Sequence, residues 1–141
     1  MLRVTTRITL QVPICVTGSR WQKGLVTGFI AFPYASRSNG RVYPTIAHGH
    51  GTSSVFRGCA PSAMPSFYEY GSWAFLVSRG YAAIATDYAG LGNNYTAHQY
   101  QVSPAQAHNL YYSVAAARKL FGHALTAEWM SVGHSQGGGA A

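Results

Sequence analysis

A run of small and apolar residues at 82–86 (AAIAT) restricts the fold of this chain more than any other feature of the sequence. A strand with no alternating polar side must be covered on both faces, which is the position of a central strand in a parallel sheet. Parallel strands are joined by crossover helices that lie on the faces of the sheet. We therefore expect an α/β fold with residues 82–86 in the middle of the sheet.

The remaining predicted elements alternate as this fold requires. Strand-like segments flank a turn region rich in Gly, Ser and Arg near the start of the chain, which predicts an opening hairpin. The elements expected besides the central strand are strands at 8–12, 25–32, 42–47 and 129–133, a loop at 36–40, and a short helix at 72–78 that Gly80 ends. This order predicts a single domain over residues 1–141 with a mostly parallel sheet.

One long helix carries its own start and stop signals. We expect Ser103 to be its N-cap, with Pro104 in the first turn and Gln106 completing a capping box. Gly122 should end the helix in the left-handed conformation. The apolar side chains recur at helical spacing and form one stripe: Leu110, Val114, Ala117 and Phe121.

The charge of the chain does not point to a nucleic-acid partner. Its formal net charge of +7 arises because ten Lys and Arg residues are accompanied by only three carboxylates, Glu69, Asp87 and Glu128. The basic residues are scattered along the sequence and form no basic helix face. We therefore expect a solvated surface and no nucleic acid.

Membrane and metal signals are weak as well. No stretch approaches the roughly 18 apolar residues that a transmembrane helix needs, and Arg3 and Arg7 interrupt the N-terminus where a signal peptide would be continuously apolar. Cys15 and Cys59 lack the spacing of metal ligands. They could pair with each other, remain thiols or bridge to another cysteine. We expect no metal, no cofactor and no transmembrane segment.

The last residues of the chain carry the strongest chemical signal. Residues 133–137 (GHSQG) match G-x-S-x-G, in which a serine stands on a sharp turn between a strand and a helix, so that its hydroxyl projects from the sheet. Such a turn crowds the positions two before and two after the serine, and both are glycine here. We predict Ser135 as a nucleophile, and Gly133, His134 and Gly137 as the residues that shape its turn.

A phosphate-binding turn is the main alternative for a glycine-rich connection between a strand and a helix. The Walker pattern needs Gly-Lys-Ser or Gly-Lys-Thr, and no lysine follows Gly138 or Gly139. The dinucleotide pattern G-x-G-x-x-G is absent from this turn too. The sequence therefore favours the nucleophile.

A serine nucleophile needs backbone amides to bind the oxyanion that forms during acyl transfer. One donor is the N–H of the residue after the nucleophile, here Gln136, and the other comes from the loop after the third strand, here HGHGT. We favour the N–H of Thr52, with Gly51 as the second choice. The side chains of His48 and His50 are expected to be polar loop residues without a catalytic part.

Three segments carry a resemblance to a known family: AHGHGTSSVFRGCAPS (47–62), GYAAIATDYAGLG (80–92) and EWMSVGHSQGGGAA (128–141). In content and spacing they resemble the secretory lipase family of fungi and some bacteria, within the α/β-hydrolases. The resemblance implies Ser135 as the nucleophile, Thr52 in the oxyanion loop, secretion, and a disulfide from Cys59 to a cysteine beyond this chain. The doubled His-Gly departs from the single H-G-T of the family, which leaves Gly51 and Thr52 both open as donors.

The other members of a catalytic triad are not found in the sequence. In this fold the acid and then the histidine follow the serine, and the residues after Ser135 include neither. Asp87 is interpreted as a turn-forming residue, and His98, His108 and His123 as residues of loop or helix surfaces. We therefore expect the N-terminal half of an α/β-hydrolase domain, truncated just after the nucleophile and inactive by itself.

The predicted function is that of a serine carboxylester hydrolase, an esterase or lipase acting on a small-molecule ester or a lipid. Two alternatives belong to other classes. One is a non-catalytic α/β module that binds an acyl ligand or a partner. The other is a serine peptidase of the prolyl oligopeptidase type, which also uses G-x-S-x-G. The sequence does not indicate the acyl preference or the oligomeric state.

Overall fold

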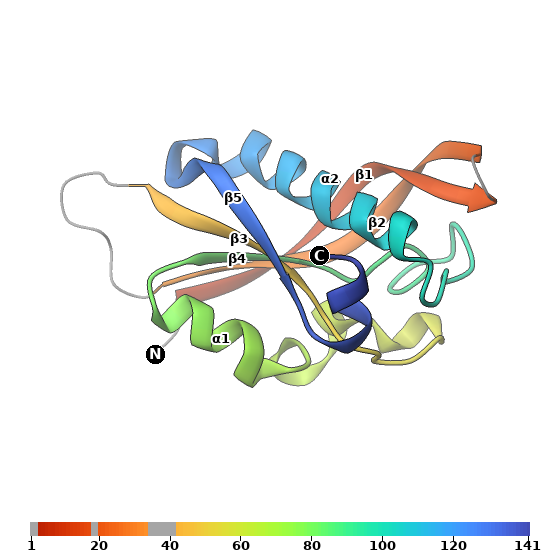
Figure 1. The fold of residues 1–141 in the computed structure, drawn as a ribbon, viewed down its shortest axis with the longest axis horizontal. Coiled ribbons are helices and arrows are strands. Elements are labelled where there is room, and N and C mark those ends of the chain that lie inside the picture. Colours follow the sequence, from red (N-terminus) through yellow and green to blue (C-terminus); the bar gives the residue numbers. More distant parts are fainter. Residues whose placement is uncertain (1–2, 18–19, 34–41) are drawn as a thin grey trace.

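The computed structural model describes residues 3–17, 20–33 and 42–141. Five strands form one sheet, with helix α2 (Ser103–Phe121) on one face and helix α1 (Tyr70–Ser78) on the other (Figure 1). The mixed α/β layering predicted from the sequence is confirmed.

The strands lie side by side in the order β1-β2-β4-β3-β5. Strand β2 is antiparallel to both of its neighbours, whereas β3 is parallel to β4 and to β5. All described strands except β2 therefore run in the same direction, as expected for a mostly parallel sheet that opens with a hairpin. The bounds are β1 (Arg3–Thr17), β2 (Arg20–Phe32), β3 (Tyr43–Gly49), β4 (Ala82–Thr86) and β5 (Leu125–Gly133).

Strand β4 has the central position predicted for it. All of its residues are buried, between β2 on one side and β3 on the other. Ile84 packs in the apolar cluster under α2, whereas Ala83 and Ala85 pack in the cluster under α1. Its neighbour approaches it closely, because a Cβ atom at Gly28 of β2 would overlap the carbonyl oxygen of Ala85. Small residues thus let the sheet carry a helix on each face.

Each face of the sheet has its own apolar core. Under α2, the predicted stripe is confirmed, since Leu110, Val114 and Ala117 are at most 2% exposed; its last member, Phe121, is only partly buried. Under α1, the ring of Trp73 packs against Phe29 with ring centroids 5.2 Å apart. The two cores fix the sheet from both sides.

The ends of α2 differ from the prediction. The helix begins at Ser103, with Val102 as its N-cap and no capping bond from a side chain, so the predicted Ser103 cap is wrong. Gln106 completes no capping box, because its side-chain amide donates to a carbonyl of the preceding loop. Gly122 has a φ of −58° and is not left-handed, since the chain continues into a 3-10 turn that leads directly to β5.

Several strands are longer than the sequence patterns indicated. The opening hairpin pairs Arg3 with Phe32 at one end and Thr17 with Arg20 at the other, and β5 begins at Leu125. Alternation of side chains marks only the middle of a strand, because the backbone ladder needs no particular side chain. The predicted loop at 36–40 lies outside the described residues.

Helix α1 agrees closely with its prediction. It begins two residues earlier than the expected Ser72, at Tyr70, and it ends at Ser78 as predicted. Gly80 has a φ of 93°, the conformation that lets a glycine turn the chain away from a helix end. This turn directs the chain into β4.

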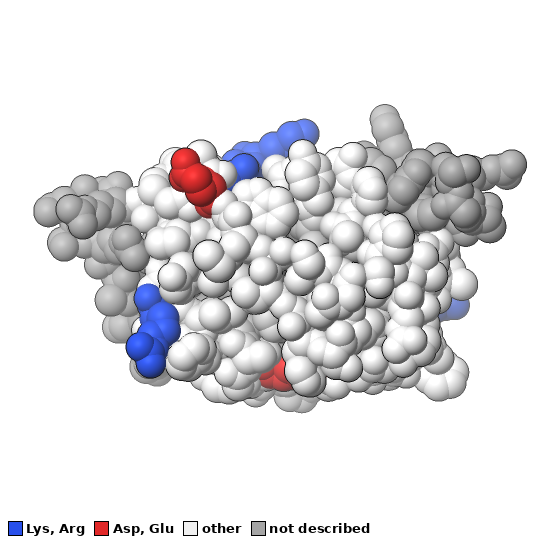
Figure 2. Space-filling model, viewed as in Figure 1, with Lys and Arg blue, Asp and Glu red and all other residues white. Residues whose placement is uncertain are grey.

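The described surface is sparsely charged. The face drawn in Figure 2 is largely uncharged, with isolated basic and acidic patches and no continuous basic area on the part that the structure describes. No described helix is both long enough and apolar enough to cross a bilayer.

Strand β5 is an edge strand within the described part of the chain, since β3 is its one neighbour there. Its side chains are more exposed than those of β4, and Met130 is 55% exposed. An edge strand leaves one row of backbone N–H and C=O groups unpaired. The candidate site begins where this strand ends.

Candidate active site

Ser135 lies in a sharp turn between β5 and a short 3-10 helix, η5 (Ser135–Gly139). Its φ of 51° falls in the left-handed region, which serine adopts rarely and at a cost of about 1–3 kcal/mol. The residue is exposed, and its hydroxyl has no hydrogen-bond partner among the described residues. The chain therefore adopts the strained strand–turn–helix geometry that the motif predicts.

The two glycines of the motif allow this turn to close. A Cβ atom at Gly133 would overlap the carbonyl oxygen of Gly137, and a Cβ atom at Gly137 would overlap the carbonyl oxygen of Gly49. Gly138 differs, because a Cβ atom there would make an ordinary contact of 3.7 Å. Close packing thus requires glycine at both motif positions, and it brings the end of β3 against the turn.

The loop after β3 lies beside Ser135. The backbone N–H of His134 donates to the carbonyl oxygen of Gly49 at 3.1 Å. This bond follows directly on the β3–β5 ladder, which ends with Gly49 opposite Gly133. The structure therefore brings together the turn at Ser135 and the HGHGT loop, the two segments on which the predicted site depends.

The candidate oxyanion donors differ in whether their amides are occupied. Within the described chain, the backbone N–H groups of Gln136 and Thr52 donate to no acceptor. The N–H of Gly51 is occupied, because it donates to Oε2 of Glu69 at 3.0 Å. Thr52 is also exposed, whereas Gly51 is buried. The geometry therefore favours Thr52 over Gly51.

Glu69 is a site residue that the sequence analysis did not find. Its other oxygen, Oε1, lies 2.9 Å from Nδ1 of His134, so one carboxylate joins the loop after β3 to the residue before Ser135. The Glu69 side chain is only 17% exposed. Glu69 precedes α1 with a φ of 45°, and the three residues before it also have positive φ. No motif or spacing in the sequence marks it.

His48, near the end of β3, and His50, in the loop that follows, are both buried, which corrects the prediction that they are polar loop residues. His48 and His50 are each 3% exposed. Burial lowers the pKa of His48 to about 4, and burial also lowers the pKa of His50. Both rings are therefore neutral near pH 7. Nε2 of His48 lies 3.0 Å from the hydroxyl of Ser72, and Nδ1 of His50 lies 2.6 Å from the carbonyl oxygen of Gly51.

Asp87 and His98 have structural partners of their own. The fully buried carboxylate of Asp87 accepts the Ser62 N–H at 2.7 Å and the Ser62 hydroxyl at 2.6 Å. Asp87 therefore has the structural role expected of it, but its carboxylate connects a distant loop to the end of β4. His98 lies in a loop as expected but is half-buried there, with Nδ1 3.1 Å from the Ala89 carbonyl oxygen and Nε2 3.4 Å from the side-chain amide nitrogen of Gln136. His108 and His123 are exposed as expected.

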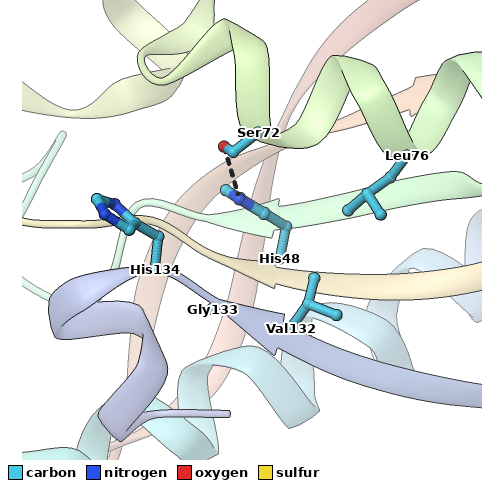
Figure 3. A pocket seen from close by; sticks show the side chains of 6 residues that line it. All are labelled: His48, Ser72, Leu76, Val132, Gly133 and His134. Atoms are coloured by element: carbon cyan, nitrogen blue, oxygen red, sulfur yellow. Dashed lines mark hydrogen bonds between the residues drawn. The ribbon is translucent and has the colours of Figure 1, made fainter.

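A hollow of about 210 Å³ lies between α1 and the end of β5 (Figure 3). In Figure 3, the side chains of His48 and Ser72 point toward each other, with His134 on one side of this pair and Leu76 on the other. The hollow borders the turn that carries Ser135. Its lining residues are His48, Ser72, Leu76, Val132, Gly133 and His134.

The described residues include no metal centre and no disulfide. No group of three His, Cys, Asp or Glu side chains within the described ranges could hold a metal ion. Cys59 is half-buried and has no disulfide partner among the residues that the structure describes. The disulfide that the family resemblance implies for Cys59 therefore stays a prediction.

These features define the class of fold. A sheet in the order β1-β2-β4-β3-β5, helices on both faces and a strained serine after β5 give this chain the fold of the α/β-hydrolases.

Solved structures are similar to this chain over nearly its whole length. The rice cell wall degrading esterase LipA from Xanthomonas oryzae has a TM-score of 0.74 and 28% identity, covering 97% of this chain and 36% of the esterase. Candida antarctica lipase A in its closed state has a TM-score of 0.62 and 14% identity, covering 99% of this chain and 36% of the lipase. The second likeness concerns the fold alone.

The chain spans about a third of the length of these solved structures. No protein-family profile and no curated protein sequence matches it. The similarity to known esterases and lipases therefore rests on the three-dimensional structure.

Proposed function

We propose that this chain supplies the acyl-accepting part of a serine carboxylester hydrolase, with Ser135 as the nucleophile. The observation that carries the proposal is the left-handed backbone of Ser135. It leaves an exposed hydroxyl beside a loop whose Thr52 amide, like that of Gln136, is free among the described residues. Strain of this kind persists where the surrounding structure enforces it, and it is concentrated at functional sites.

The proposed reaction follows the usual course of acyl transfer. Oγ of Ser135 attacks the ester carbonyl carbon, and its proton passes through a base to the departing alcohol oxygen, which leaves the acyl group on Oγ. The N–H groups of Gln136 and Thr52 bind the negative oxygen of the tetrahedral intermediate. Water then attacks the acyl group, releases the acid and restores the hydroxyl.

A base is needed because a neutral serine hydroxyl is a weak nucleophile. Two imidazoles near the turn have other partners: His134 contacts Glu69, and His48 contacts Ser72. The proposal accordingly assigns the nucleophile and the oxyanion donors, and it gives neither of these histidines the role of the base.

We assign the substrate class as a small-molecule ester or a lipid, and the narrower family as the secretory lipases. The similarity to the esterase LipA, at 28% identity, supports an ester as the class of substrate. The segments around Gly51 and Ser135 that resemble secretory lipases support the narrower family.

The test is made on the complete product of the gene. Ser135→Ala should abolish the hydrolysis of p-nitrophenyl butyrate and the labelling by a fluorophosphonate probe. Ser131→Ala is the matched control, because Ser131 lies on β5 before the turn and its hydroxyl donates to the backbone of Ala141. Activity that survives Ser135→Ala would overturn the proposal. A complete product that binds esters but labels at no serine would favour the non-catalytic module.

A further inference from the structure

We propose that Glu69 and His50 are positioning residues that select the Thr52 N–H, and withhold the Gly51 N–H, for the substrate oxygen. The inference rests on the proposed function, because it concerns which amide of the loop after β3 acts as the second oxyanion donor. It concerns residues that touch the loop and not the substrate.

The first of the two positioning residues is Glu69, which acts through its carboxylate. Oε2 accepts the Gly51 N–H at 3.0 Å, and Oε1 lies 2.9 Å from Nδ1 of His134. One carboxylate therefore occupies the Gly51 amide and ties the loop to the turn of Ser135. There is no space for a side chain between these groups: a Cβ atom at Gly51 would overlap Oε1 of Glu69 and come within 3.0 Å of Nδ1 of His134.

The second positioning residue is His50, which acts through its ring. Nδ1 lies 2.6 Å from the carbonyl oxygen of Gly51. A carbonyl can only accept, so Nδ1 carries the proton of this bond. In a trans peptide the C=O and the N–H point in opposite directions. Fixing the Gly51 carbonyl on His50 therefore directs the Thr52 N–H away from the buried ring, toward the exposed side of the loop.

The ring of His50 is itself held firmly. It packs against the tilted ring of Tyr88 with ring centroids 4.4 Å apart, and the Tyr88 hydroxyl donates to the His50 carbonyl at 3.1 Å. The ring of Tyr68 lies at right angles to that of His50, with ring centroids 6.1 Å apart, and its hydroxyl donates to the carbonyl of Thr52 at 2.8 Å. The peptide groups on both sides of Thr52 thus have fixed carbonyls.

The segment that supplies Tyr68 and Glu69 is strained. Ser66, Phe67, Tyr68 and Glu69 have φ between 45° and 55°, and none is glycine. Four consecutive residues with positive φ, none of them glycine, are not expected from local preference. In this conformation two successive side chains, Tyr68 and Glu69, reach the same loop. The strain is what a positioning role for this segment would require.

The first experiment measures the amides directly in the complete gene product, labelled with ¹⁵N-glycine and ¹⁵N-threonine. In the free protein, we expect slow exchange for the Gly51 amide proton and fast exchange for that of Thr52. Glu69→Ala should speed exchange at Gly51 by at least about tenfold, because the Gly51 N–H loses the acceptor of its hydrogen bond. Glu69→Gln should retain part of the protection. Equal exchange at Gly51 and Thr52 in the unmodified protein would overturn the proposal.

The second experiment measures catalysis by the same protein. Glu69→Ala should lower kcat by about 10- to 100-fold, less than the 10²–10³-fold typical of removing an oxyanion donor, with KM within about twofold. Glu69→Gln and His50→Asn, which keep a hydrogen-bonding group in place, should recover much of kcat, whereas His50→Leu should not. Glu128→Ala is the control, because Glu128 is an exposed carboxylate on β5.

The two experiments distinguish a failure of the positioning proposal from a failure of the proposed hydrolase function. A Glu69→Ala variant that melts at a lower temperature but keeps its kcat and the protection of Gly51 would show that Glu69 has no positioning role. Activity that survives Ser135→Ala would remove the proposed function, and the amide exchange of the free protein would still decide whether Glu69 and His50 orient the loop.

Discussion

The backbone N–H of His134 donates to the carbonyl oxygen of Gly49 at 3.1 Å, which joins the residue before the exposed serine to the last residue of β3. The bond follows the parallel ladder of β3 and β5 without a gap. The left-handed turn at Ser135 is therefore anchored to the end of the sheet. The loop that follows Gly49 lies beside this turn, because it begins at the same end of β3.

This close packing makes a direct prediction for the glycines. Gly137→Ala would force its Cβ into the carbonyl oxygen of Gly49, and we expect a loss of about 1–3 kcal/mol in the free energy of unfolding. Thermal denaturation measures the loss. Gly138→Ala, whose Cβ would make only an ordinary contact at 3.7 Å, should change stability by less than about 0.5 kcal/mol. Equal effects of the two substitutions would contradict the packing described.

The contact between Asp87 and Ser62 makes a second prediction. Asp87→Ala removes a buried carboxylate that accepts both the N–H and the hydroxyl of Ser62. Two buried donors would lose their acceptor, and we expect a destabilisation of about 2–4 kcal/mol. Urea denaturation measures it, with Glu128→Ala as the exposed control. In a double-mutant cycle, Ser62→Ala and Asp87→Ala should be non-additive; additive effects would mean that the two residues do not interact.

The buried histidines make the stability of the chain depend on pH. Burial lowers the pKa of His48 from 6.5 to about 4, so between these values the unfolded chain binds a proton that the folded chain does not. The free energy of unfolding should therefore fall as the pH is lowered from 6.5 to 4, by up to about 3 kcal/mol. His50, whose pKa is also lowered by burial, adds to the effect in the same direction.

The variant His48→Gln tests this assignment, because glutamine can keep a bond to Ser72 but does not titrate. Its stability should vary less between pH 6.5 and pH 4 than that of the unmodified chain. His123→Gln, at an exposed position, should leave the pH profile unchanged. An unaltered slope in the His48→Gln variant would show that folding does not lower the pKa of His48.

Local sequence patterns predict β4 and the turn at Ser135 because these elements depend on their own residues. An apolar run must be covered on both faces, and a tight turn requires glycine where its neighbours approach. Both requirements act over a few residues. The positions of Ile84 and Gly137 in the structure follow from them.

The parts that sequence patterns miss depend on distant contacts. Glu69 acquires its place from a left-handed segment and from two partners far along the chain, Gly51 and His134. The ends of α2 were predicted from local capping signals at Ser103 and Gly122. They differ in the structure because the preceding loop and the following strand determine where the helix begins and how it continues.

The edge strand β5 predicts self-association. Its one neighbour in the described sheet is β3, and Met130 exposes 55% of its surface. An unpaired strand edge with exposed apolar side chains is a template for pairing with another copy. Met130→Lys should therefore reduce the self-association of the chain, measured by analytical ultracentrifugation. Leu120→Lys removes a similarly exposed apolar residue from α2, and an equal reduction by that variant would argue against strand pairing.

The last prediction concerns Ser135 in the 141-residue chain by itself. Its hydroxyl has no hydrogen-bond partner among the described residues, and the adjacent His134 is held by Glu69 on the α1 side of the turn. Without a base the hydroxyl stays neutral and unreactive, however well the free amides are placed. The chain should therefore hydrolyse p-nitrophenyl butyrate no faster than its Ser135→Ala variant. A rate that depends on Ser135 would mean that one of the histidines described above, His134 first among them, leaves its present partner and serves as the base.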